Sequence, residues 1–150
     1  MPSDNVTPFR RRPPPKPVQR GGGLTSHRGK AVLAQALTLA AFGLSFVFAA
    51  PPLSYIAMAV AIAGGAVALS NRAEAMPWAQ THHEHALRTL IIGYAILTLA
   101  SLLIFISGSM LIVYFYVQIA VTIWAALRAG IGLVLAIMRK PIWNPRGPLV

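Results

Sequence analysis

The sequence predicts an all-α integral membrane protein with four transmembrane helices, folded as two hairpins with both termini in the cytoplasm. Two observations lead to this prediction. Hydrophobic residues make up 56% of the 150 residues and charged residues only 11%, whereas an ordinary soluble domain contains about 25% charged residues. In addition, residues 31–71 and 89–127 contain no charged residue, and each stretch is about twice the ~20 residues that a helix needs to cross the hydrocarbon core.

Each uncharged stretch is interrupted near its middle by residues that favour a turn. Pro51 and Pro52 interrupt the first, because proline removes a backbone donor and disfavours the helical region for the residue before it. Ser107, Gly108 and Ser109 interrupt the second with small, flexible residues. The predicted spans are therefore 31–50, 53–70, 86–106 and 110–127.

The basic residues predict the orientation. All 13 lysine and arginine residues lie outside the two uncharged stretches, and neither turn carries a charge. The positive-inside rule places such basic segments in the cytoplasm. The net charge of +10 would indicate nucleic-acid binding in a soluble protein. Because the charges flank apolar spans here, we expect no nucleic-acid partner.

Residues 1–30 are predicted to form a disordered cytoplasmic tail, since prolines alternate with arginines and three glycines follow. The tail has three interpretations: a solvated segment that sets topology, a segment that contacts anionic lipid headgroups, and a proline-rich docking site for a partner. Each basic residue near an anionic surface contributes about 1 kcal/mol. The residues expected to contact lipid or a partner are Arg10, Arg11, Arg12, Lys16, Arg20, Arg128, Arg139 and Lys140.

The second span is rich in small residues. Ala57, Ala61 and Gly65 lie at four-residue spacing and are expected to form a helix-packing face. In lipid there is no hydrophobic force between helices, so small residues at this spacing allow close backbone contact. We favour packing against the chain's own helices over an interface with a second copy or a partner.

The start of the third helix is predicted at a capping box. Thr81 is followed three residues later by Glu84, just before an apolar run, which is the pattern of a capping box. This places the first helical residue at about His82, in the cytoplasm. Glu84 and Arg88 are four residues apart and are expected to form an ion pair on one helix face.

Metal and haem sites are not expected. His82 and His85 share a helix face and are weak metal candidates, but two ligands do not make a zinc or iron site. The chain has no cysteine, which excludes thiolate ligands. A haem needs axial histidines within the bundle, and all four histidines lie outside the predicted spans. No cofactor is therefore predicted.

Arg128 follows directly after the fourth predicted span and has two interpretations. It is either an arginine within the membrane that lines a path or holds an anionic group, or an arginine whose side chain extends to the headgroups. We favour the second, because a charge at mid-membrane is costly. Gly130 and Gly132 then allow the backbone to turn, so that 130–138 forms an interfacial helix and 139–150 a cytoplasmic tail.

Two stretches resemble a known family. Residues 83–90 resemble the "H-x-x-x-Q-x-R-T-F" opening of a helix in an uncharacterised family of small bacterial inner-membrane proteins, with Ala86 in place of the glutamine and Leu90 in place of the aromatic residue. Residues 124–133 and 140–142 resemble that family's "W-x-x-x-R-x-x-x-G-L" and "K-P" segments. The family is distantly similar to the twenty-kilodalton Tic component of the chloroplast translocon. The resemblance covers roughly residues 80–145 and implies a four-helix fold in the bacterial inner membrane.

Three functions follow from these patterns. The two uncharged stretches contain no ionisable residue apart from tyrosines, so we expect neither a proton relay nor an enzyme. The first hypothesis is an accessory or assembly subunit that packs beside a larger membrane complex or forms a homo-oligomer. The alternative is a small transporter, pore or translocon-like component. The third is a surface module that binds anionic lipid.

Overall fold

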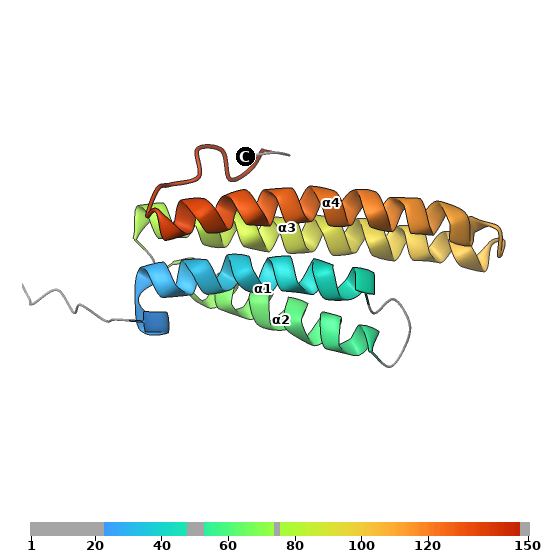
Figure 1. Ribbon diagram of the computed structural model, residues 1–150, viewed down its shortest axis with the longest axis horizontal. Helices are drawn as coiled ribbons and strands as arrows, with labels where there is room; N and C mark the ends of the chain where they lie inside the picture. The colour runs from blue at the N-terminus through green and yellow to red at the C-terminus, as the bar shows by residue number, and fades with distance from the viewer. Residues whose placement is uncertain (1–22, 48–52, 74–75, 148–150) are drawn as a thin grey trace, which may run out of the picture.

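The computed structural model describes residues 23–47, 53–73 and 76–147, which form two antiparallel helical hairpins (Figure 1). These residues contain helices and no strand, so the all-helical prediction is confirmed. Short 3-10 helices precede the first helix and extend the third. The elements are η1 (Gly23–Thr25), α1 (His27–Val47), α2 (Ser54–Ser70), α3 (Pro77–Leu102), η2 (Leu103–Phe105) and α4 (Met110–Ile137).

Three helical segments have the length and composition to cross a membrane. They are α1 with 21 residues, α3 with η2, which together have 29, and α4 with 28. α2 is as apolar but shorter, with 17 residues. The chain is therefore a helical protein with three long apolar helices that could span a membrane.

The predicted start of the third helix is wrong. α3 begins at Pro77, with Met76 as its N-cap residue and no side-chain cap. Proline suits the first helical position because its fixed φ is already helical and the missing N–H would have no helical partner there. Thr81 lies one turn inside the helix, where its hydroxyl donates to the Trp78 carbonyl oxygen at 2.7 Å. The Thr81–Glu84 pattern therefore does not form a capping box.

The predicted turn after Arg128 is also wrong, because α4 continues without a break to Ile137. Gly132 serves for close approach between helices, since a Cβ atom there would lie 2.7 Å from Gln35 Oε1 on α1. A glycine within a helix costs about 1 kcal/mol relative to alanine, which does not end a helix that packs against its neighbours. The segment 130–138 is thus part of α4 and its end rather than a separate interfacial helix.

The centre of the bundle is filled by Phe42 of α1. Its side chain is fully buried, and its ring packs against Tyr94 with 5.1 Å between centroids. Gly93 makes room for the ring, because a Cβ atom at that position would lie 2.3 Å from Phe42 Cζ. The Phe42 ring on α1 thus packs directly against Gly93 on α3 and fills the space between the helices at this position.

α2 packs through small residues, as predicted, but along a different line. Ala57 and Ala61 are buried, whereas a Cβ atom at Gly65 would meet nothing within 4 Å. Gly64 takes the interface position instead, since a Cβ atom there would lie 3.2 Å from Leu37 Cβ. A helix of 3.6 residues per turn rotates by about 40° over each four-residue step, so the contact line moves from Ala61 to Gly64. The interface is within the chain.

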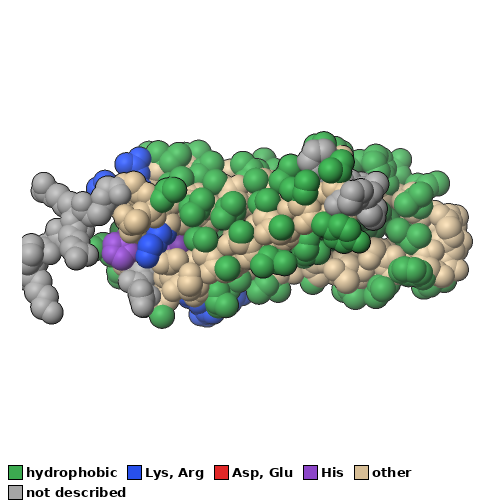
Figure 2. All heavy atoms as spheres, turned by 90° about the horizontal axis from the view of Figure 1, so that it is seen from below, with side chains coloured by type: hydrophobic (Ala, Val, Ile, Leu, Met, Phe, Trp, Pro, Cys, Tyr) green, Lys and Arg blue, Asp and Glu red, His purple; other side chains and the backbone are tan. Residues whose placement is uncertain are grey.

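One end of the bundle, which we call the basic end, holds the start of α1, the end of α2, the start of α3 and the end of α4 (Figure 1). Figure 2 shows lysine, arginine and histidine side chains gathered toward this end and hydrophobic side chains along the rest of that face. After α4, residues 138–147 turn back along the bundle, and Ile142 is only 2% exposed. Ile142 therefore packs on the helices, while most of residues 138–147 are exposed. The segment that we predicted as a cytoplasmic tail, 139–150, is thus held to the bundle at this residue.

Candidate functional site: a buried polar cluster at the basic end

The basic end buries an unusual group of polar side chains. Arginine, histidine and amide side chains are rarely buried unless they form hydrogen bonds. Here they come from α1, α3 and α4 and face one another inside the bundle. The fully or almost fully buried members at this end are Gln35, His82, His83, His85, Thr89 and Arg128. We call them the polar cluster.

Gln35 joins α1 to α3. Its side-chain amide nitrogen donates to the His82 carbonyl oxygen at 3.0 Å and lies 3.3 Å from His85 Nδ1. Because an amide NH₂ only donates, His85 Nδ1 is the acceptor and its ring proton sits on Nε2. Gly132 of α4 also lies close to the amide group, since a Cβ atom at this position would lie 2.7 Å from Gln35 Oε1. α1, α3 and α4 therefore meet around one glutamine.

His82 and Thr81 hold the segment that follows α4. His82 Nε2 donates to the Lys140 carbonyl oxygen at 2.8 Å, since a carbonyl only accepts. The Ile142 N–H donates to the Thr81 hydroxyl at 3.1 Å. Thr81 thus joins α3 to the C-terminal segment. It does not cap a helix, although we predicted that it would.

Arg128 is buried, with 2% of its surface exposed, so the interpretation in which it extends to the headgroups is wrong. Its Nε donates to the Thr89 hydroxyl at 2.9 Å, and its terminal nitrogens donate to the Pro145 carbonyl at 3.0 Å and to the Gly147 carbonyl. The guanidinium carbon lies 5.7 Å from the centre of the Trp124 ring, within the range of a cation–π contact. Arg128 therefore ties α4 to α3 and to the C-terminal segment.

A surface ion-pair group lies beside the polar cluster. Arg88 Nε is 2.6 Å from Glu84 Oε1, which is the ion pair predicted from their spacing. Arg72, at the end of α2, adds a second contact at 2.8 Å to Glu84 Oε2. Glu84 thus joins α2 to α3, a contact that the linear spacing alone did not indicate.

The described histidines are not arranged as metal ligands. Within residues 23–47, 53–73 and 76–147, no three histidine, cysteine, aspartate or glutamate side chains lie close enough to hold a metal ion. One ring nitrogen each of His82 and His85 is occupied by the hydrogen bonds above. His83 differs, because both of its buried ring nitrogens lack a hydrogen-bond partner among the described residues. Gln35 Oε1, His82 Nδ1 and His85 Nε2 are also buried without a partner among the described residues, but each of these side chains makes a hydrogen bond through another atom. The cluster therefore supports packing and hydrogen bonding, and His83 is its least satisfied member.

The predicted lipid or partner contacts other than Arg128 divide into two groups. Arg139 and Lys140 are exposed just after α4, at the basic end. The remaining positions lie outside the described residues. Those positions are Arg10, Arg11, Arg12, Lys16 and Arg20.

Gln35 and Thr89 belong to the polar cluster, although the sequence did not identify them as site residues. A pattern for Thr89 existed: His82, His85 and Thr89 repeat at three- and four-residue intervals and so share one face of α3. Thr89 also donates to the His85 carbonyl at 2.7 Å. For Gln35, the sequence signal was a lone amide in an otherwise apolar run.

Comparison with known proteins finds no similar protein. No family model matches this chain, and searches of curated proteins and of solved structures return no significant match. The resemblance described for residues 80–145 therefore stays a prediction. Function must be inferred from the residues and contacts of this chain alone.

Proposed function

We propose that the protein is a non-enzymatic membrane protein with four crossings, which acts as an accessory or assembly subunit beside a larger membrane complex. The observation that carries this proposal is the end of the α3–α4 hairpin, which extends beyond α1 and α2 (Figure 1). We call it the projecting end. It lies opposite the basic end, and its exposed face combines aromatic residues with polar groups.

Four crossings are supported by the return of α2 to the basic end (Figure 1). Its 17 uncharged residues reach about 26 Å at 1.5 Å per residue, and a bilayer adapts to a short helix by local thinning. The basic residues then favour a cytoplasmic location for the basic end. A bacterial inner membrane with both termini inside agrees with this arrangement.

The projecting end exposes large side chains. Phe105 is 88% exposed and Ile106 78%. Beside them lies a surface groove of about 630 Å³, and Tyr114 is one of its lining residues. The Tyr114 hydroxyl has no hydrogen-bond partner within the described part of the chain. The lining residues are Ser101, Ile104, Leu111, Ile112, Tyr114, Phe115, Tyr116 and Gln118.

A transmembrane helix of another protein suits this groove. Lipid tails offer no hydrogen bonds, whereas helices in membranes associate through close packing and interhelical hydrogen bonds. α1 ends at Val47, so the chain's own first helix does not cover this part of α3 and α4. A partner helix would cover the aromatic residues and supply a partner for Tyr114.

The transport alternative has less support. The fully buried Phe42 ring against Gly93 closes the bundle centre. A path for a solute would have to displace this ring and the residues packed on it. The accessory role requires no such rearrangement.

The test compares a variant of the groove with a control variant in native membranes. Tyr114→Phe/Phe115→Ala removes the polar and aromatic contacts of the groove, and Ile123→Ala changes a residue of similar exposure elsewhere on α4. We expect the wild-type chain to migrate within a larger complex after extraction in mild detergent, and the groove variant to migrate alone. The free energy of unfolding of the groove variant should stay within the change typical of surface substitutions, about 0.5 kcal/mol.

Two results would contradict the proposal. One is a wild-type chain that always migrates as a lone monomer in mild detergent. The other is equal release from the complex by Ile123→Ala, which would remove the link to the groove.

A further inference from the structure

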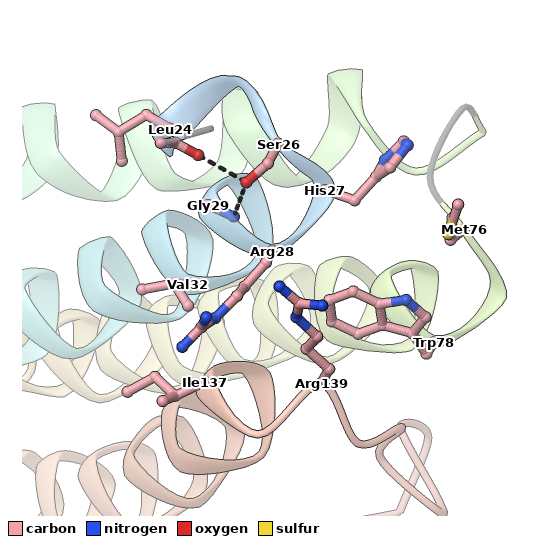
Figure 3. Close-up of a pocket in the computed structure, with 11 residues that line it drawn as sticks. Leu24, Ser26, His27, Arg28, Gly29, Val32, Met76, Trp78, Ile137 and Arg139 are labelled. Carbon is pink, nitrogen blue, oxygen red and sulfur yellow. Dashed lines mark hydrogen bonds between the residues drawn. The ribbon is translucent and has the colours of Figure 1, made fainter. Parts of the chain in front are cut away.

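A second surface pocket lies at the basic end, outside the polar cluster. It has a volume of about 590 Å³ and lies between the start of α1 and the end of α4 (Figure 3). Arg28 comes from the first turn of α1, Trp78 from the first turn of α3, and Arg139 from the residues just after α4. Three segments that are far apart in the sequence thus line one pocket.

The charges of the pocket are unbalanced. Arg28, Arg139 and His27 line it, and no described acidic residue does. Neither guanidinium group makes an ion pair or a side-chain hydrogen bond with the described residues. Glu84, whose carboxylate lies at the same end of the bundle, is already paired with two other arginines. Two arginines in one pocket, with no counter-charge among the described residues, favour the binding of an anion.

The backbone at Arg139 supports a role for its side chain. Arg139 has φ 57°, a left-handed conformation that glycine adopts without steric cost. Its N–H donates to the Ala136 carbonyl at 3.2 Å, and the Lys140 N–H donates to the Leu135 carbonyl at 2.9 Å. This is the hydrogen-bond pattern of a Schellman motif, in which glycine is usual at the left-handed position. An arginine in this position is strained, and strain of this kind is retained most often at functional sites.

The remaining lining residues are apolar. Val32 and Ile137 lie beside the arginines, and Leu24 and Met76 complete the wall (Figure 3). Arginine forms paired hydrogen bonds with phosphate oxygens, and tryptophan is enriched at the boundary between lipid tails and headgroups. A ligand that satisfies both parts of the pocket has an anionic phosphate next to an apolar chain.

We propose that the pocket formed by Arg28, Arg139 and Trp78 binds the headgroup phosphate of an anionic membrane lipid. The pocket lies at the ends of α1 and α4, two of the helices long enough to cross a membrane, which is where headgroups meet a spanning bundle. A soluble phosphate ester shares the anionic group but leaves the apolar wall uncovered. This site is separate from the groove at the projecting end, so either proposal can fail without the other.

The test measures the affinity of the purified full-length chain for phosphatidylglycerol. The chain in neutral detergent is titrated with this lipid or with phosphatidylcholine, and bound lipid is counted by native mass spectrometry. Arg28→Gln/Arg139→Gln should weaken phosphatidylglycerol binding by roughly thirtyfold, which corresponds to about 1 kcal/mol for each of two basic residues. The matched control Lys140→Gln/Arg146→Gln removes the same number of charges from exposed positions nearby and should have a much smaller effect.

A third variant separates binding from folding. Arg139→Gly relieves the left-handed strain, so its unfolding midpoint should be unchanged or higher, while lipid affinity should fall by roughly fivefold. An equal loss in the control pair would show that charge alone matters and would overturn the site. Displacement of the lipid by a similar concentration of glycerol phosphate would assign the pocket to a soluble phosphate ester and overturn the lipid proposal. Equal affinity for phosphatidylcholine would overturn it as well.

Discussion

The two ends of the α3–α4 hairpin differ in how far their polar side chains are enclosed by the rest of the chain. At the basic end, four helices and the C-terminal segment enclose an arginine, three histidines and a glutamine, and hydrogen bonds join these side chains to one another and to the backbone. At the projecting end the same two helices stand without α1 and α2 (Figure 1). There the Tyr114 hydroxyl has no hydrogen-bond partner in the described residues.

The difference shows what four helices achieve that two do not. A buried polar group needs partners from several directions, and at the basic end they come from three helices and a returning segment. At the projecting end no third element is present among the described residues, so large side chains remain exposed. At the basic end the chain supplies hydrogen bonds to Gln35, His82, His85 and Arg128, although His83 and single atoms of Gln35, His82 and His85 have none among the described residues. The other end is where we propose that a partner binds.

The largest effect is expected at Arg128. Arg128→Met removes hydrogen bonds to Thr89, Pro145 and Gly147 and should lower the free energy of unfolding by about 2–4 kcal/mol. Phe105→Ala at the projecting end should change it by about 0.5 kcal/mol or less. Unfolding in mixed detergent and SDS micelles measures both. Similar losses for the two variants would abolish the contrast between the ends.

A smaller effect is expected at the bundle centre. Gly93→Ala places a methyl group against the Phe42 ring and should destabilise the chain by about 1–3 kcal/mol, the usual cost of overpacking. Gly65→Ala, also in a helix but with open space around the new methyl group, should stabilise it by about 0.5–1 kcal/mol. The same unfolding assay applies. If Gly65→Ala destabilises the chain instead, Gly65 contacts another helix, as we predicted from the sequence.

The smallest changes in the free energy of unfolding are expected at two histidines of the polar cluster, His83 and His85. His85→Leu loses the contact with Gln35 and should cost about 1–2 kcal/mol. His83→Leu removes two buried nitrogens that have no hydrogen-bond partner among the described residues and should be neutral or stabilising by about 1 kcal/mol. Chemical-shift changes of the remaining histidines would report whether the cluster keeps its geometry. A loss at His83 as large as that at His85 would mean that His83 has a partner in the membrane.

Much of the fold could be predicted from the placement of charges and turn residues. Two long uncharged stretches, each divided by turn residues, indicated two hairpins, and the structure has them. The ion pair between Glu84 and Arg88 also followed from spacing. These predictions succeeded because each depends on residues that are close in sequence.

Most of the failures concern contacts between distant segments. Gly132 appeared to allow a turn, whereas it permits the approach of Gln35, which lies almost a hundred positions earlier. Arg128 appeared interfacial, because nothing in a linear pattern indicates that residues 145 and 147 fold back to accept its hydrogen bonds. The Thr81–Glu84 pattern fitted a cap, but Pro77 gave the helix an earlier start. Burial of a polar side chain depends on the tertiary arrangement, which spacing does not contain.

The hydrogen bonds of Arg128 also have a consequence for folding. Two of its acceptors belong to residues 17 and 19 positions later in the chain, in the segment that follows α4. Until this segment folds back, the terminal nitrogens of the guanidinium need other acceptors, such as water. The folding back of this segment over α3 and α4 is then the step that completes the burial of Arg128.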